Sequence, residues 1–298
     1  MQNDSEYKTG LIYTISAFII WGVVTLFFKQ LTEVPPLELI AHRSLWSLVL
    51  LALIISYTKK WSVIFETFKN RKLLLTLIFT SVLIMGNWSL YIWAILNGHI
   101  IESSLGYFIN PLLNVLLGVL MLNERLTRAQ TVAISLAAIA IVIRLIFVGT
   151  FPWIALSLAT SFAIYGYLRK TIKIGAAEGL FIELFIMLLP IIGFLFYWHN
   201  AYGLSFGTIS LRIDVLLVLA GVVTAVPLLL FSAGARRIRL STVGLLQYIA
   251  PSMQFCIGLY YGEEFTQIDA LVFGLIWTGL VIYSWSSLKQ NRKAAATS

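Results

Sequence analysis

The chain has 298 residues, of which 59% are apolar and 11% are charged, and it carries a formal net charge of +8. Soluble domains contain about 25% charged residues, so this composition excludes an ordinary water-soluble globular protein. The mean hydropathy of +0.90 indicates a protein whose solvent is lipid. The only cysteine, Cys256, excludes an internal disulfide.

Ten stretches of the sequence are uncharged or nearly uncharged and approach the length of about 20 residues that crosses a bilayer. They cover residues 10–28, 37–57, 73–97, 103–122, 129–148, 151–168, 179–198, 213–235, 241–262 and 269–288. The fifth and sixth stretches are divided at Gly149-Thr150-Phe151-Pro152, because Gly and Pro favour a tight turn. We therefore predict an all-α integral membrane protein with ten transmembrane helices.

The distribution of basic residues predicts the orientation of these helices. With the N-terminus in the cytoplasm, 17 of the 21 Lys and Arg residues fall in cytoplasmic loops and tails, including a short basic C-terminal tail. Only Lys29 and Arg212 fall outside, and the remaining two, Arg43 and Arg144, lie within spans. The positive-inside rule therefore predicts that both termini are cytoplasmic.

The two halves of the chain resemble each other. A shift of 140 residues aligns Phe108-Ile109-Asn110-Pro111 with Tyr248-Ile249-Ala250-Pro251, and it also aligns Asn114 with Gln254, Gly118 with Gly258 and Glu124 with Glu264. Since five spans per half is an odd number, the halves must have opposite orientations in the membrane. We predict two inverted five-helix repeats, residues 1–148 and 149–298, a construction that many secondary transporters use to bind substrate near the midplane. The alternative is a duplicated scaffold with no transport function.

Two prolines indicate a polar cavity in the fourth and ninth spans. Pro111 and Pro251 fall in the middle of these spans, where each removes a helical hydrogen bond. Helical spacing places polar side chains on the same faces as the prolines. The predicted substrate-binding residues there are Tyr107, Asn110, Asn114, Gln247, Tyr248 and Gln254. The alternative for each amide is a hydrogen bond between neighbouring helices, with no ligand.

The third span adds Asn87, Trp88 and Tyr91 near its middle. Aromatic belts lie at the membrane interfaces, so aromatic residues at this depth need another explanation. We predict that they form a stacking wall for an aromatic or amphipathic substrate. Ordinary core packing is the alternative for each residue taken alone.

Charged residues within spans indicate functional positions. The 140-residue shift aligns Arg43 with Glu183, and His42 precedes Arg43. At 1.5 Å per residue, Arg43 and Glu183 should lie about 12 Å apart along the membrane normal, so no direct salt bridge is expected. We hypothesise that His42, Arg43 and Glu183 flank one pathway, in which Arg43 holds a carboxylate and Glu183 carries a coupling proton. Snorkelling to the nearer interface is the alternative.

Glu124 and Glu264 close corresponding helices on opposite sides of the membrane. We hypothesise that they latch the cytoplasmic and outer gates. Ordinary surface ion pairs are the alternative.

The sequence contains no zinc-protease, nucleophile-elbow, P-loop or dinucleotide-binding motif. His42, His99 and His199 lie on different elements and show no metal-binding spacing. We therefore expect a protein that is no enzyme and has no cofactor, metal or nucleic-acid partner. Its partners would be the lipid bilayer and a small-molecule substrate.

Five stretches carry a family resemblance: AHRSLWS (41–47), GNWSLYIWA (86–94), SLGYFINPLLNVLLG (104–118), FIELFIMLLP (181–190) and RLSTVGLLQYIAPS (239–252). They resemble the RarD branch of the EamA group in the drug/metabolite transporter superfamily. The resemblance implies ten helices in two inverted EamA repeats, a bacterial inner-membrane location and the activity of a permease. The family name is linked with chloramphenicol sensitivity, and relatives in the superfamily export amino acids and other small metabolites.

The sequence thus predicts a secondary transporter that exports small amphipathic metabolites or drugs by alternating access. Amino-acid-like compounds and chloramphenicol are the candidate substrates. A facilitative channel for small polar solutes is the first alternative, and it would conduct without saturation. A membrane-embedded sensor or enzyme is the second, but no signalling domain or nucleophile–base pair is visible.

Overall fold

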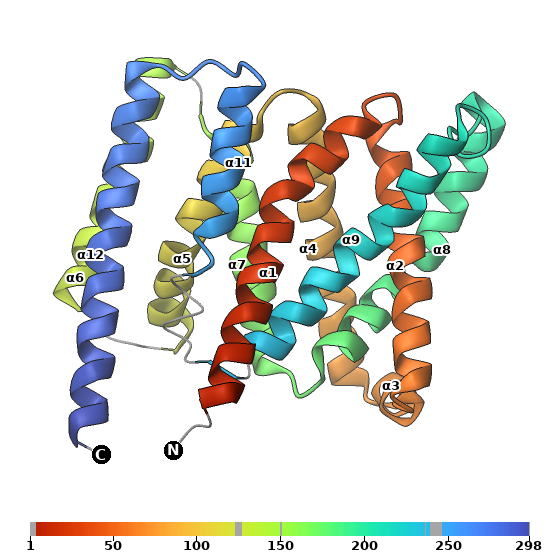
Figure 1. Cartoon of the computed structure of the whole chain (residues 1–298), viewed down its shortest axis with the longest axis horizontal. Helices are drawn as coiled ribbons and strands as arrows, with labels where there is room; N and C mark the ends of the chain where they lie inside the picture. Colours follow the sequence, from red (N-terminus) through yellow and green to blue (C-terminus); the bar gives the residue numbers. More distant parts are fainter. Residues whose placement is uncertain (1–3, 123–126, 150, 236, 239–245, 298) are drawn as a thin grey trace.

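The computed structural model describes residues 4–122, 127–149, 151–235, 237–238 and 246–297, and this part of the chain is helical (Figure 1). Its helices are α1 (Asp4–Phe28), the 3-10 helix η1 (Lys29–Leu31), α2 (Pro36–Tyr57), α3 (Trp61–Lys69), α4 (Arg71–Leu96), α5 (Ile100–Leu122), α6 (Arg128–Val148), α7 (Trp153–Thr171), α8 (Ala176–Tyr202), α9 (Leu211–Ala235), α11 (Ile249–Tyr260) and α12 (Gln267–Thr297).

Seven helical segments among the described residues are long and apolar enough to cross a membrane. They are Ser5–Leu31, Pro36–Tyr57, Arg71–Leu96, Arg128–Phe147, Ala176–Tyr202, Leu211–Phe231 and Gln267–Ser286. The prediction of an all-α, multi-pass membrane protein is therefore confirmed.

Local sequence explains where several helices begin and end. The Asn70 side chain accepts a hydrogen bond from the Leu73 backbone N–H and caps the start of α4. A capping box formed by Thr127 and Gln130 starts α6. This helix ends at Gly149, whose φ of 71° lies in the left-handed region that glycine adopts without strain. The next helix starts after Pro152, so the chain is divided into two helices where the sequence predicted the division.

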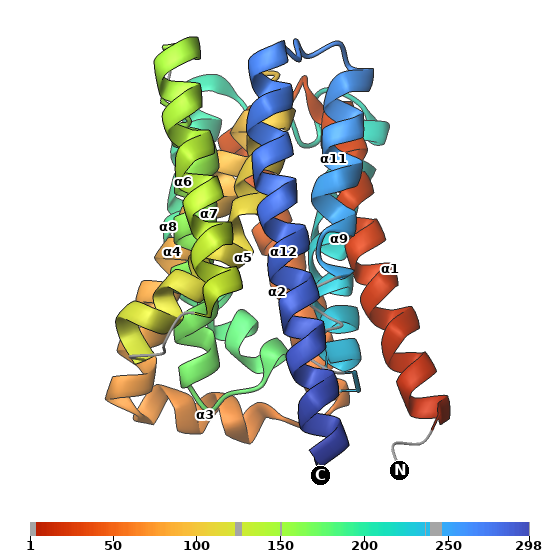
Figure 2. The ribbon, with the colours of Figure 1, turned by 90° about the vertical axis from the view of Figure 1, so that its left-hand side faces the viewer.

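The helix α3 is absent from the sequence prediction, which treated its residues as a loop. Ile64 and Thr67 are buried on its inner face. The Trp61 ring meets the ring of Phe181 edge to face at 5.4 Å, which packs α3 against α8. The outer face exposes 63% of Phe65. The chain between α2 and α4 is thus an amphipathic helix that lies across one end of the bundle (Figure 2).

Eight helices form a ring of successive contacts. The order around the ring is α1, α9, α2, α8, α4, α7, α5, α11 and back to α1. The pair formed by α6 and α12 packs outside this ring, against α5, and stands at one edge of the molecule in Figure 1. The interior of the ring is therefore reached by side chains from both halves of the sequence.

Two glycines are examples of close approach between ring helices. A Cβ atom on Gly221 of α9 would lie 2.5 Å from the carbonyl carbon of Trp46 in α2. A Cβ atom on Gly106 of α5 would lie 2.7 Å from the carbonyl oxygen of Ala155 in α7. Small residues are a common means of bringing membrane helices together, because their backbones can then touch.

The position of Pro251 corrects the sequence prediction. This proline lies in the first turn of α11, which begins at Ile249 after a turn at Gln247 and Tyr248. It does not lie in the middle of a continuous helix, and at this position its missing N–H breaks no helical hydrogen bond. Pro111, in contrast, lies within α5 as predicted.

The start of α1 and the end of α12 lie at the same end of the molecule (Figure 1). We call it the basic end, because the helix ends and loops there carry Lys8, Lys59, Lys60, Lys69, Arg71, Lys72, Arg128, Arg169, Lys173 and Arg237. Lys29 and Arg212 lie at the other end, which we call the far end.

Candidate functional site

Arg43 is a buried cation inside the ring, on α2, with 7% of its surface exposed. Its Nε donates a hydrogen bond of 2.8 Å to Thr224 Oγ1 of α9. The hydroxyl of Thr224 in turn donates to the Ala220 carbonyl oxygen at 2.7 Å, which fixes its oxygen as an acceptor for the guanidinium. Nη1 of Arg43 is buried and has no hydrogen-bond partner among the described residues.

Aromatic rings cover the faces of this guanidinium. Its Cζ lies 4.2 Å from the ring centroid of Trp88 and 5.5 Å from that of Phe28. Tyr91 lies one helical turn from Trp88 on α4, and its ring meets the ring of Tyr107 edge to face at 5.6 Å. Both tyrosines interact electrostatically with Arg43. The structure thus brings together Arg43 and three aromatic residues that the sequence placed in the substrate site.

Gln254 joins this group from α11. Its Nε2 donates to the Tyr91 hydroxyl at 3.0 Å and to the Trp21 carbonyl oxygen of α1 at 3.0 Å. The Tyr91 hydroxyl also lies 3.1 Å from Thr25 Oγ1. The buried Oε1 of Gln254 has no hydrogen-bond partner among the described residues. One hydrogen-bond chain therefore connects α1, α4 and α11 next to the arginine.

Asn87 and Asn110 lie between helices. Asn87 Nδ2 donates to the Leu158 carbonyl oxygen at 2.9 Å, and Asn110 Nδ2 donates to that of Ala159 at 3.1 Å. Both contacts join a ring helix to α7, which is the packing role that we gave as the alternative to ligand binding. The buried Oδ1 of Asn87 has no described partner.

Glu183 forms a second polar cluster, nearer the basic end. Its carboxylate accepts from Thr80 Oγ1 of α4 at 2.6 Å and from the Tyr165 hydroxyl of α7 at 3.1 Å. Arg169 Nε lies 3.8 Å from the same carboxylate. The sequence analysis counted Arg169 as a loop cation, but α7 continues to Thr171 and directs this side chain inward. Among the described residues, Glu183 forms no ion pair with Arg43.

Two further buried carboxylates, which the sequence analysis missed, fasten the two ends of the ring. At the far end, Glu38 of α2 accepts from Ser205 N at 2.7 Å, from Ser205 Oγ at 2.9 Å and from Phe206 N at 3.2 Å. At the basic end, Glu178 of α8 pairs with Lys60 Nζ at 2.5 Å. The available signal was the 140-residue shift, which aligns Glu38 with Glu178.

His42 lies beside the far-end contact. Its ring stacks on that of Phe206 at 4.9 Å, and its Nε2 lies 3.8 Å from Glu38 Oε1. Neither ring nitrogen has a hydrogen-bond partner among the described residues. The histidine is therefore placed next to the loop that follows α8, on the far-end side of Arg43.

The predicted gate residues have different outcomes. Glu124 lies outside the described residues, and Glu264 is exposed, so its gating role stays a prediction. The neighbouring residue Glu263 binds the start of α5 instead. Its carboxylate accepts hydrogen bonds from the backbone N–H groups of Ile100 and Ile101 at 2.7 Å each. Burial raises the pKa of the Glu263 carboxyl, whereas these two hydrogen bonds oppose the shift.

The remaining predicted site residues lie near the start of α11 or outside the described part. Gln247 is half-buried in the turn before the helix. The Tyr248 ring stacks on the Phe108 ring of α5 at 6.3 Å. The side chain of Asn114 lies outside the described residues.

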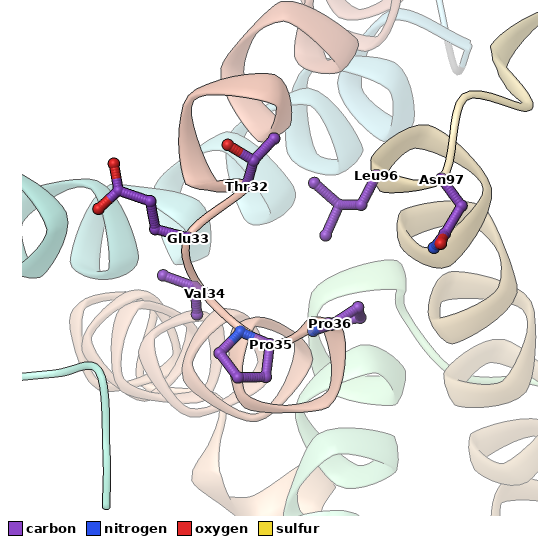
Figure 3. A pocket seen from close by; sticks show the side chains of 7 residues that line it. All are labelled: Thr32, Glu33, Val34, Pro35, Pro36, Leu96 and Asn97. Atoms are coloured by element: carbon purple, nitrogen blue, oxygen red, sulfur yellow. The ribbon is translucent and has the colours of Figure 1, made fainter.

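A surface pocket of about 320 Å³ opens at the far end, between the start of α2 and the end of α4 (Figure 3). The residues that line it are Thr32, Glu33, Val34, Pro35, Pro36, Leu96 and Asn97. Glu33 points away from Leu96 and Asn97 in Figure 3, so its carboxylate does not converge with the Asn97 amide. The pocket contains none of the residues that the sequence placed in the substrate site.

Comparison with known proteins assigns the chain to a family. The EamA-like transporter family matches residues 8–146. An uncharacterized transporter of Vibrio cholerae is 44% identical over 98% of this chain and 97% of its own length. A protein named RarD from Streptomyces exfoliatus is 42% identical over 99% of this chain and 94% of its own length. The chain belongs to the RarD family of EamA-like transporters.

The RarD assignment agrees with the fold. A solved crystal structure matches with a TM-score of 0.61 and 16% identity, covering 95% of this chain and 99% of that chain, which shows the shared architecture alone. As a RarD-family protein, the chain is a membrane transporter, and the relatives described above carry transporter or RarD names. Within the described residues, no three His, Cys, Asp or Glu side chains gather as metal ligands.

Proposed function

We propose that this RarD-family protein is a secondary transporter built from ten transmembrane helices in two inverted repeats, and that it works by alternating access. The observation that carries the proposal is a symmetry in the contacts between helices. Exchanging α1 with α7, α2 with α8, α4 with α9, α5 with α11 and α6 with α12 leaves the main contact pattern unchanged. Inverted repeats of this kind supply the two related conformations that alternating access requires.

The exchange holds for individual pairs of helices. The contact of α5 with α7 becomes that of α11 with α1, and the contact of α1 with α9 becomes that of α7 with α4. The pairs α2–α8, α5–α11 and α6–α12 map onto themselves. Phe108 and Tyr248, which the 140-residue shift aligns, stack on each other at 6.3 Å. Equivalent residues in contact are expected only beside a two-fold axis.

The polar contacts follow the same exchange. Arg43 is the eighth residue of α2 and bonds to Thr224 of α9, whereas Glu183 is the eighth residue of α8 and bonds to Thr80 of α4. The shift of 140 aligns Arg43 with Glu183, and a shift of 144 aligns Thr80 with Thr224. In the proposed repeat, the cation Arg43 in one half of the membrane would thus correspond to the carboxylate Glu183 at the equivalent position of the other half.

These positions suggest the roles of the two charged residues. Arg43 would hold an anionic group of the substrate, and Glu183 would carry a coupling proton. The carboxylate of Glu183 is 1% exposed and bonds to two hydroxyl groups, Thr80 and Tyr165, and lies near Arg169. Taking up a proton would weaken its attraction to Arg169, which couples protonation to the contact between α7 and α8.

The proposed location is the bacterial inner membrane with both termini in the cytoplasm. Support comes from the basic end, where the start of α1, the end of α12 and most of the described basic loop residues lie together. The substrates proposed on family grounds are small amphipathic compounds, such as amino-acid-like metabolites or chloramphenicol. Export is the proposed direction.

Flux measurements test the proposal against a facilitative channel. Purified protein in proteoliposomes is given labelled amino acids and chloramphenicol, with and without a pH gradient, and protein-free liposomes serve as the control. We expect flux that saturates with concentration for at least one compound and changes with the gradient. Flux that rises linearly without saturation would favour the channel.

A further inference from the structure

We propose that the site around Arg43 selects monoanionic carboxylates with a flat apolar body, and that it discriminates against zwitterions and cations of the same shape. This inference rests on the proposed transport function and narrows its substrate class: among the small amphipathic compounds proposed above, the site ranks monoanionic carboxylates above zwitterionic amino acids, which it binds more weakly.

Arg43 is a buried charge that has no counter-charge within the part of the chain that the structure describes. The ion pairs among the described residues are His42–Glu38, Lys60–Glu178, Arg144–Asp269, Arg169–Glu183 and Arg237–Glu6, and Arg43 belongs to none of them. Burying an unpaired ion is strongly unfavourable because the ion loses its hydration, and a cation–π contact recovers only part of that free energy. The rings of Trp88 and Phe28 therefore do not fully offset the desolvation of the guanidinium, and an anionic ligand would.

The geometry of the guanidinium directs how such a ligand binds. The Trp88 ring covers one face at 4.2 Å, and Nε is already engaged by Thr224. Arginine has five N–H donors in one plane, and Nη1 is buried without a partner. The open donors thus lie at the edge of the plane, which is where a carboxylate binds through two parallel hydrogen bonds.

The surroundings of Arg43 favour a flat apolar body attached to that carboxylate. Tyr91 and Tyr107 present edge-to-face rings, and the Phe162 ring of α7 lies 6.3 Å from that of Tyr107. Gln254 and Thr25 hold the Tyr91 hydroxyl in place, so this wall is fixed before a ligand arrives. Aromatic rings stack favourably against such walls in offset or edge-to-face geometry.

Neither Glu183 nor Glu38 is placed to serve an ammonium group bound beside Arg43. Glu183 bonds to Thr80, which lies eight residues below Trp88 in α4, or about 12 Å at 1.5 Å per residue. Glu38 is already engaged by Ser205 and Phe206. The amino group of an α-amino acid lies too close to its own carboxylate to reach Glu183.

Net charge then decides between ligands of equal shape. A monoanion leaves the pair with Arg43 neutral, a zwitterion leaves a net charge of about +1 in a low-dielectric interior, and a cation leaves about +2. The free amide oxygens of Asn87 and Gln254 can accept hydrogen bonds, but they carry no compensating charge.

Three probes with the same aromatic body separate these cases. Hydrocinnamate is phenylalanine without its amino group, L-phenylalanine is the zwitterion, and phenethylamine is the cation. Binding to the purified full chain in detergent is measured by isothermal titration, without any gradient or flux. We expect hydrocinnamate to bind at least about tenfold more tightly than phenylalanine, and phenethylamine not to bind.

Variants assign the selectivity to the guanidinium. Arg43→Gln should lose hydrocinnamate binding, and Arg43→Lys should weaken it because an ammonium cannot form the two parallel bonds. Arg212→Gln, an exposed arginine at the far end, is the matched control and should bind as the unmodified chain does. Monodisperse elution and an unchanged far-UV spectrum show that each variant is folded.

Three results would overturn the inference: phenylalanine binding as tightly as hydrocinnamate, no hydrocinnamate binding at millimolar concentration, or unchanged binding by a folded Arg43→Gln protein. These failures differ from a failure of the transport proposal. Selective binding of hydrocinnamate together with linear flux would support the anion site and contradict alternating access. Saturable flux of zwitterions alone would support alternating access and contradict the anion site.

Discussion

Transport by the Glu183→Gln protein is expected to lose its dependence on a pH gradient. Glutamine keeps the size of the side chain and an acceptor for Thr80, but it cannot take up or release a proton. The fold should survive, because Arg169 also lies within 3.4 Å of the carbonyl oxygens of Gly175 and Ala176 and is not left without acceptors. The measurement is initial flux in proteoliposomes at several external pH values.

We expect the gradient-driven flux of the Glu183→Gln protein to fall by about tenfold or more. A tenfold fall corresponds to a rise of roughly 1.4 kcal/mol in the activation free energy of transport. Glu66→Gln is the matched control, since Glu66 is an exposed carboxylate of α3 at the same end of the molecule. Its flux and pH dependence should be unchanged. A Glu183→Gln protein with the original rate and pH dependence would remove the proton role.

Weakening the contacts at the two ends of the ring is expected to open opposite ends. Glu38 fastens α2 to the loop after α8 at the far end, and Glu178 fastens α8 to Lys60 at the basic end. In alternating access, each contact stabilises the conformation that is closed at its own end. Glu38→Gln should therefore populate the conformation open at the far end, and Lys60→Gln the one open at the basic end.

The two effects should differ in size. Glu38 is fully buried and accepts three hydrogen bonds, and losing one partner of a buried charged network costs about 3 kcal/mol. The Lys60 side chain is 51% exposed, so its pair with Glu178 is screened and contributes about 1 kcal/mol or less. The shift towards the open state should consequently be much larger for the Glu38 variant.

A single cysteine reports these openings. Thr25→Cys is introduced together with Cys256→Ser, because Thr25 is fully buried in the interior of the ring. An impermeant thiol reagent is added from one side of the membrane at a time. Glu38→Gln should speed labelling from the far end, and Lys60→Gln from the basic end, whereas the exposed control Glu33→Gln should change neither. Faster labelling from the same side in both variants would contradict the account.

Long apolar runs made most helices predictable from the sequence. The predicted spans 37–57 and 73–97 correspond to Pro36–Tyr57 and Arg71–Leu96, because lipid leaves few polar residues inside a span. Helix α3 could not be found in this way. It has nine residues, too few to cross a membrane. Its apolar face packs against α8, a partner that is distant in the sequence and that the pattern of α3 alone does not identify.

The candidate site was predictable in its residue types but not in its contacts. Polar, charged and aromatic residues within spans identified Arg43, Trp88, Tyr91 and Gln254, which the structure brings together. Spacing along a single helix did not reveal that Asn87 bonds to a carbonyl group of α7, because such partners belong to another segment.

In the proposed mechanism, two inverted halves expose one substrate site to each side of the membrane in turn. Counterflow distinguishes this mechanism from a channel. Proteoliposomes are loaded with a saturating unlabelled substrate, and a trace of labelled substrate is added outside. We expect label to accumulate transiently inside, above its external concentration, because the unlabelled substrate inside competes with the label for the site and slows the exit of label. Label that only equilibrates, at a rate independent of the internal substrate, would contradict alternating access.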